Sequence, residues 1–209
     1  MSERTHRALP TSGLLSSCLD PEETDCEFPD GSANVNTPPV QPTKLVTQEE
    51  RELVSHWLLA ATDDRDLARK QWAEQEIALL ACGGIFAAVR IPALLVWAAA
   101  GTDELPEVDD FLRKTLYGGP VFMDIHAHQY YLLVPASTAW RWNDRDFPGV
   151  ACLGRDHYLG VPAIRHTTPR GRSYWCVPLD SPAELCTYRN VEVLIRAGIR
   201  ARRIEGIGR

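Results

Sequence analysis

The sequence predicts one α+β domain in which helices flank a mainly antiparallel sheet. Between Thr47 and Leu116, capped helical patterns surround two short apolar runs. From Pro120 to Val177, short runs rich in β-branched and aromatic residues are separated by Gly and Pro, which is typical of strands joined by turns. Helices placed before and after a run of strands favour the α+β class.

The domain organisation follows from composition. The first 50 residues carry nine acidic and three basic side chains, are rich in Ser, Thr and Pro, and lack apolar periodicity. Such a segment cannot bury enough apolar surface to offset its conformational entropy. We therefore expect a disordered acidic tail at residues 1–45, one domain at residues 46–200, and a basic C-terminal tail at residues 201–209.

Capping residues mark most of the expected helices. Thr47 begins T-Q-E-E, a capping box, and Asp63 or Asp64 can cap the next helix. The S-P-A-E motif at Ser181 is a further capping box, and Gly198 is the expected end of the helix that follows. The helices predicted in this way span residues 48–61, 64–75, 92–100, 107–116 and 182–197.

Seven short strands are expected between these helices. Gly83 and Gly84 lie between the first two apolar runs, so we expect a hairpin turn there. Trp140 and Trp142 are two residues apart, and we expect both indoles to be buried against the sheet on one face. The predicted strands span residues 77–81, 85–91, 121–125, 129–134, 150–153, 158–161 and 174–177.

The net charge of −6 excludes a protein that is basic throughout, yet the charge is uneven. Residues 151–209 carry ten basic and five acidic side chains. The arginine-rich end can meet an anion, or its charges can simply be solvated at the end of a helix. The acidic tail or the C-terminal helix can also bind a protein partner. The arginines of the last 21 residues are Arg189, Arg196, Arg200, Arg202, Arg203 and Arg209.

Cysteine usage and hydropathy indicate a cytoplasmic protein with no membrane partner. No two of the six cysteines have C-x-x-C spacing, which leaves a zinc ribbon or a thioredoxin-like site unsupported. The N-terminus has no apolar core typical of a signal peptide, and no run approaches 18 apolar residues. We expect reduced thiols, several of them in the core.

One short motif offers an enzymatic alternative. On a strand, Asp124, His126 and His128 would project to one face, and a carboxylate with two imidazoles can bind zinc or iron. The motif resembles the D-x-H-x-H strand of amidohydrolase-type metal enzymes, which implies a metal-dependent hydrolase. Their barrel requires about 200 residues or more, whereas the domain expected here is shorter.

A longer resemblance extends from Ala78 to Pro178. The segments ALLACGGIFAAVRIPALLVWAA, HQYYLLVP, CLGRDHYLGVPA and SYWCVP occur in an order that resembles the N-terminal domain of bifunctional primase/polymerases of actinobacteria and their mobile elements. That family uses a D-x-D pair to bind the divalent ions of nucleotidyl transfer. The corresponding stretch here reads Ala88-Val89-Arg90 and contains no acid.

The resemblance without the carboxylates implies a binding or regulatory module rather than a polymerase. Phosphates of a nucleotide or nucleic acid would then be contacted by arginines and by the family's nucleotide-binding histidine. No cofactor is expected, and a divalent metal is expected only in the hydrolase alternative. The residues that this resemblance implies for nucleotide or nucleic-acid binding are Arg90, His128, Arg155, Arg170 and Arg172.

Overall fold

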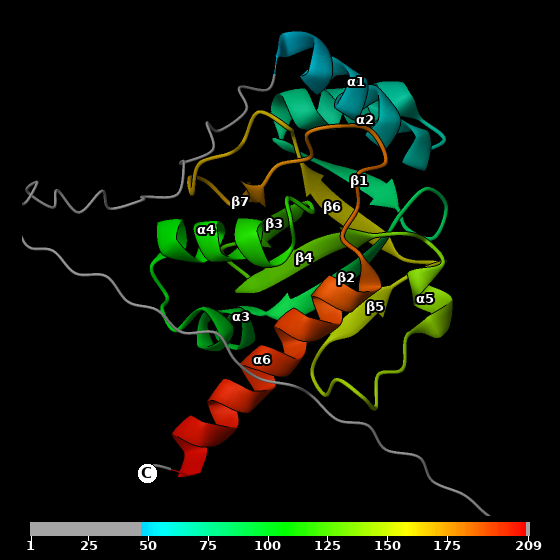
Figure 1. Ribbon diagram of the computed structural model, residues 1–209. Coiled ribbons are helices and arrows are strands. Elements are labelled where there is room, and N and C mark those ends of the chain that lie inside the picture. The colour runs from blue at the N-terminus through cyan, green and yellow to red at the C-terminus, as the bar shows by residue number, and fades with distance from the viewer. Residues whose placement is uncertain (1–46, 208–209) are drawn as a thin grey trace, which may run out of the picture. The chain divides into compact units, whose positions relative to one another are not determined.

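The computed structural model (Figure 1) describes residues 47–207, and the side chains of residues 47–204. Its helices are α1 (Gln48–Leu58), a 3-10 turn (Leu59–Ala61), α2 (Arg65–Glu74), α3 (Ala93–Ala100), α4 (Leu105–Thr115), α5 (Thr138–Arg141) and α6 (Tyr188–Ile207). Its strands are β1 (Ile77–Ala81), β2 (Ala87–Pro92), β3 (Val121–Asp124), β4 (Gln129–Val134), β5 (Ala151–Leu153), β6 (Tyr158–Pro162) and β7 (Ser173–Val177).

Two antiparallel sheets are formed by residues 47–207. The main sheet has five strands in the order β5-β2-β4-β3-β7, and the small sheet pairs β1 with β6. Helices and antiparallel strands are thus combined as the sequence predicted, and the α+β class is confirmed. The expected disordered tail at residues 1–45 lies outside the described residues.

Helices α3, α4 and α6 cover one face of the main sheet (Figure 1). Strand β2 contributes Val89 and Ile91 to this face, and both are fully buried. Leu95 of α3, Leu112 of α4 and Ile195 of α6 belong to the same apolar cluster. Because side chains alternate along a strand, Ala88 and Arg90 of β2 face the other side of the main sheet.

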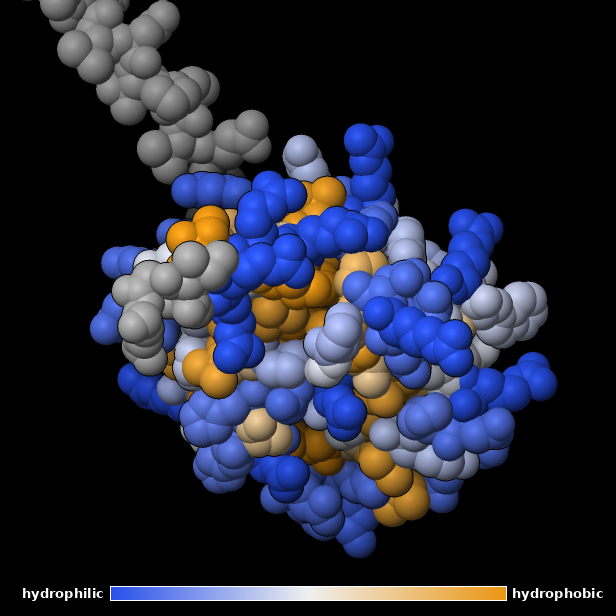
Figure 2. Space-filling view, turned by 90° about the horizontal axis from the view of Figure 1, so that it is seen from below, coloured by the Kyte–Doolittle hydropathy of each residue, from blue (hydrophilic) through white to orange (hydrophobic). Residues whose placement is uncertain are grey.

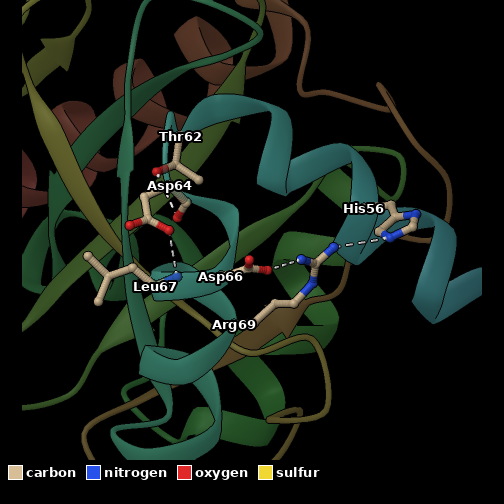
Figure 3. A network of polar contacts seen from close by, with 6 residues as sticks. All are labelled: His56, Thr62, Asp64, Asp66, Leu67 and Arg69. Carbon is tan, nitrogen blue, oxygen red and sulfur yellow. Dashed lines mark hydrogen bonds and ion pairs between the residues drawn. The ribbon is translucent and has the colours of Figure 1, made fainter.

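A second layer, made of α1, α2 and the small sheet, covers the opposite face. It buries Ala88 of β2 and Leu133 of β4 against residues of all its own elements. Figure 3 shows how its two helices are joined: Arg69 of α2 reaches Asp66 at 2.8 Å and the His56 ring of α1 at 3.4 Å. These exposed polar contacts are weak, so apolar burial is the main source of the layer's stability.

The predicted N-terminal caps of the first two helices are present, whereas Ser181 caps no helix. The Thr47 hydroxyl accepts a hydrogen bond from the backbone N–H of Glu50, whose carboxylate accepts one in return from the Thr47 backbone. Asp64 accepts from the Leu67 backbone N–H at 2.9 Å and begins α2. Gly101 ends α3 with a positive φ of 75°, as a glycine at a helix C-terminus commonly does.

The predicted hairpin between the first two strands is wrong. Strands β1 and β2 form where expected, but β1 pairs with β6, whereas β2 pairs with β4 and β5. The Gly83 backbone N–H donates to the Phe86 carbonyl at 2.7 Å, and the chain then passes from the small sheet to the main sheet. The glycine turn therefore connects two layers instead of two paired strands.

The last helix differs from its prediction at both ends. Residues 181–184 do not continue into a helix, since Ala183 has a φ of +64°. Thr187 lies just before α6 and its hydroxyl accepts from the Asn190 backbone N–H. Gly198 lies inside α6 instead of ending it. Its glycine allows α3 to pack closely, because a Cβ there would overlap the Leu95 carbonyl oxygen of α3. The domain boundary expected at residue 200 also falls within this helix.

The two indoles of residues 140 and 142 diverge, which contradicts their predicted burial on one face. Residues 138–141 form a helical turn instead of a strand, so period-two spacing does not align them. Trp142 is half-buried against Phe147, with ring centroids 5.1 Å apart. Trp140 is 85% exposed.

None of the helices in the described part of the chain has the length and apolar character needed to cross a membrane. Cys82, Cys152, Cys176 and Cys186 are free thiols, and three of them are buried in the core as expected.

Replacing Gly198 with Ala is expected to destabilise the domain, because the new methyl group would force α3 and α6 apart. Overpacking of this kind costs roughly 1–3 kcal/mol. Urea denaturation of the G198A variant should show a lower midpoint than the unsubstituted protein. Gly84→Ala is the control, since a Cβ at Gly84 meets nothing within 4 Å. Equal midpoints for G198A and G84A would contradict the tight helix contact.

Candidate functional site

A polar cleft lies where the second layer leaves the main sheet uncovered. Ala88 and Leu133 are buried beneath that layer, whereas Arg90 is exposed and Tyr131 is only half-buried on the same sheet face. The cleft has a volume of about 730 Å³, within the range typical of small-molecule sites. Its walls come from α2, the small sheet, strands β2 to β4 and the residues that begin β7.

Two arginines face into the cleft from different parts of the chain. Arg90 lies on β2, directly opposite Tyr131 of β4 in the strand register. Arg172 immediately precedes β7, next to Ser173, which pairs with Asp124 of β3. Strand pairing therefore brings both guanidinium groups to the same end of the main sheet, as the sequence resemblance implied for anion contacts.

Of the two carboxylates that line the cleft, Asp124 and Glu76, the first already has close partners. Asp124 accepts a hydrogen bond from the Ala127 backbone N–H at 2.9 Å and pairs with Arg172 at 3.6 Å. Glu76 faces the His166 ring at 3.8 Å. Arg90 forms no hydrogen bond or ion pair with any residue that the structure describes. Arg90 is therefore a cation of the cleft with no ionic partner among the described residues.

Tyr131 lies between the two arginines as a neutral hydrogen-bonding group. Its ring stacks on Phe122, with centroids 5.0 Å apart and an angle of 15° between the planes. Burial raises the pKa of the Tyr131 phenol, and the nearby Arg90 offsets only part of this rise. The hydroxyl consequently keeps its proton at neutral pH and can donate to an anion beside Arg90.

The opposite wall is the outer face of the small sheet, and it is apolar. Leu79 of β1 is 53% exposed and Tyr158 of β6 is 67% exposed. Gly160, which pairs with Leu79, adds no side chain between them. A planar apolar group can therefore lie against this wall while a charged group reaches Arg90.

Buried hydrogen bonds hold this wall in place. The Trp72 indole N–H donates to the Val161 carbonyl at 2.9 Å, which fixes α2 on β6. The Trp175 indole N–H donates to the Pro162 carbonyl at 3.0 Å and fixes β6 on the main sheet. Since both acceptors are at the end of β6, the small sheet has a defined position beside the cleft.

Three of the residues expected to bind nucleotide or nucleic acid are not part of the cleft lining. His128 has a φ of +51° in the turn after β3, and its ring meets Trp97 of α3, on the side of the main sheet that the helices cover. Arg155 lies in an exposed turn, with its backbone against Gly83. Arg170 is an exposed loop residue.

Several cleft residues were missed in the sequence. Tyr131, His157 and Tyr158 all line the cleft. A signal was present for Tyr131, because period-two alternation places it on the same face as Leu133 and opposite to Tyr130. His157 and Tyr158 follow a turn whose direction the sequence did not indicate.

The geometry does not support the metal-site alternative. Strand β3 ends at Asp124, and residues 125–128 form a turn, so His126 and His128 do not continue the alternation of the strand. Within residues 47–207, no group of three or more His, Cys, Asp or Glu side chains is arranged to hold a metal ion. The predicted common face of Asp124, His126 and His128 is therefore absent.

Comparisons of the chain with protein-family models, with curated proteins and with solved structures found no match. The cleft itself is therefore the basis for proposing a function.

Replacing both His126 and His128 with Ala is expected to leave zinc binding unchanged, because both lie in a turn and form no metal-holding group with Asp124. The measurement is metal content after dialysis of untagged protein against zinc and then against metal-free buffer. Asp124→Asn serves as the companion variant. Stoichiometric zinc in the unsubstituted protein that is lost in the double variant would restore the hydrolase alternative.

Proposed function

We propose that the chain is a non-catalytic binding module whose cleft takes a phosphate-bearing ligand with a planar ring, namely a nucleotide. The observation that carries this proposal is Arg90, an arginine that lines the cleft and has no hydrogen-bond or ionic partner among the described residues. Arg172 and the neutral Tyr131 hydroxyl supply further donors to the same anion. Arginine suits this task because its planar group binds phosphate oxygens in pairs.

The apolar wall supports a nucleotide over inorganic phosphate. Leu79 and Tyr158 are large, exposed and line the same cleft as the arginines, and an aromatic base gains free energy by covering such residues. A ligand with a phosphate at Arg90 and a base at Tyr158 uses both walls of the cleft.

The relationship to primase/polymerases belongs to the same proposal. The order of strands and helices that suggested the resemblance places Arg90 where that family carries acids, on a strand that reads Ala88-Val89-Arg90. We propose a fold of that kind that has kept a nucleotide cleft and lost the chemistry. A cytoplasmic location is part of the proposal, and the free thiols of the described cysteines support it.

Arg90→Ala is expected to weaken the binding of both ATP and inorganic pyrophosphate. A hydrogen bond to a charged group contributes roughly 1.5–3 kcal/mol, which corresponds to about tenfold or more in affinity. Arg90→Lys should recover part of the loss, since it keeps the charge and loses the paired donors. The measurement is isothermal titration calorimetry.

Two further variants separate the walls of the cleft in the same titrations. Tyr158→Ala should weaken ATP and leave pyrophosphate unchanged, because pyrophosphate has no base to stack. Arg155→Ala, an exposed arginine outside the cleft lining, should change neither. The proposal is wrong if Arg155→Ala weakens binding as much as Arg90→Ala does.

Primer extension in the presence of magnesium or manganese is expected to yield no product. Two-metal nucleotidyl transfer needs carboxylates close together that are free to bind metal, and Asp124 is already held by the Ala127 backbone N–H and Arg172. The assay uses labelled primer, template and the four deoxynucleotides. Extension by the unsubstituted protein that disappears in Arg90→Ala would refute the non-catalytic part of the proposal.

A further inference from the structure

A second surface is formed by α6 and the segment that precedes β5. The Trp142 ring lies 6.2 Å from that of Tyr188 at the start of α6 and 5.1 Å from that of Phe147. The Arg196 guanidinium lies 5.4 Å from the centre of the Phe147 ring. These contacts hold residues 142–147 against the helix, so the loop and α6 present one continuous surface.

Arginines line this surface at helical spacing. Arg196, Arg200 and Arg203 are four and three residues apart, which places them on one face of α6 over about 10 Å. Together with Arg145 of the loop they line a groove of about 460 Å³. Figure 2 views the molecule from the side on which α6 ends, and long hydrophilic side chains project there around apolar surface.

The charges of the groove are only partly compensated. Arg196 pairs with Glu192 at 2.8 Å. Arg145, Arg200 and Arg203 form no ion pair with any residue in the described part of the chain, and Asp146 is the single acid among the residues that line the groove. A regular run of cations with few acids complements a chain of phosphates.

An exposed tryptophan lies on α5, directly before this segment in the chain. Trp140 is 85% exposed, and Arg141 beside it is also exposed. A solvated indole of this size packs against nothing in the fold, so its contribution to the domain core is small. Aromatic side chains beside arginines are the combination that binds single strands, by stacking on bases while cations contact the backbone.

We infer that this surface binds single-stranded nucleic acid, with phosphates at Arg145, Arg196, Arg200 and Arg203 and a base stacked on Trp140. A duplex hides its bases and an acidic peptide has none, so neither would use the indole. The surface lies on the opposite side of the main sheet from the nucleotide cleft. The inference is therefore independent of the function proposed for the cleft.

The test is fluorescence anisotropy with short labelled oligothymidylate and oligouridylate at several salt concentrations, using the full chain. About four phosphate contacts predict a slope near −3 in log affinity against log salt, so affinity falls roughly fifty-fold between 50 and 200 mM. The double variant Arg200→Gln, Arg203→Gln should about halve that slope. The two oligonucleotides report whether the sugar affects binding.

The contribution of the Trp140 indole and that of positive charge elsewhere on the surface are tested with separate variants. Trp140→Ala should weaken binding about tenfold with an unchanged salt slope, and Trp140→Phe should recover most of the loss. The control is Arg65→Gln with Lys70→Gln, which removes two exposed cations of α2 in the second layer.

Several outcomes would overturn the inference. The first is the absence of binding near 50 mM salt, and the second is binding by the Arg65→Gln, Lys70→Gln control as weak as that of the α6 double variant. The third is a duplex bound as tightly as the single strand, and the fourth is displacement of the oligonucleotide by polyglutamate at equal charge concentration. Thermal melts of each variant establish that a loss of binding comes from a folded protein.

Discussion

A charged residue on an otherwise apolar strand constrains how the main sheet can be covered. Strand β2 buries Val89 and Ile91 under α3 and α6 on one face and Ala88 under the second layer on the other. Arg90 lies on that second face, and burying an unpaired guanidinium there would cost several kcal/mol. The second layer therefore has to end before Arg90. The cleft is the consequence of this restriction, with an arginine at its base.

Local features of the sequence predicted the positions of most helices and strands. Thr47, Asp64 and Gly101 begin or end helices through contacts with residues a few positions away, so their roles can be predicted without knowing the fold. Strand pairing depends on contacts distant in the sequence, and the hairpin predicted at Gly83 was wrong for that reason. The prediction that Gly198 ends the last helix was wrong for the same reason. Its glycine provides space for the Leu95 carbonyl of α3 in the middle of α6.

Part of the candidate site could also be predicted from the sequence. Arg90 and Arg172 were named in the sequence through the resemblance to primase/polymerases, and both line the cleft. Tyr131 was hidden beside Tyr130, since only the register reveals which of the two faces the cleft. His128 was misplaced because a positive φ turns the chain toward α3, an effect that residue type alone does not predict.

The net charge of −6 is unfavourable for the two proposed anion sites as a whole-chain property, yet charge acts locally. At physiological ionic strength, the interaction between exposed charges is largely screened beyond about 8 Å. An anion at Arg90 therefore senses mainly Arg172, Asp124 and Tyr131, and not the acidic residues elsewhere in the chain. Because Asp124 is already paired with Arg172, Arg90 is left without an ionic partner among the described residues.

The same screening separates the two surfaces from each other. The main sheet lies between the cleft and the arginines of α6, so a phosphate at Arg90 has little electrostatic effect on a strand at Arg200. A ligand that contacts one or two cations also depends on salt less steeply than one that contacts four. Salt dependence is thus the property by which binding at the cleft and binding at α6 can be told apart in one protein.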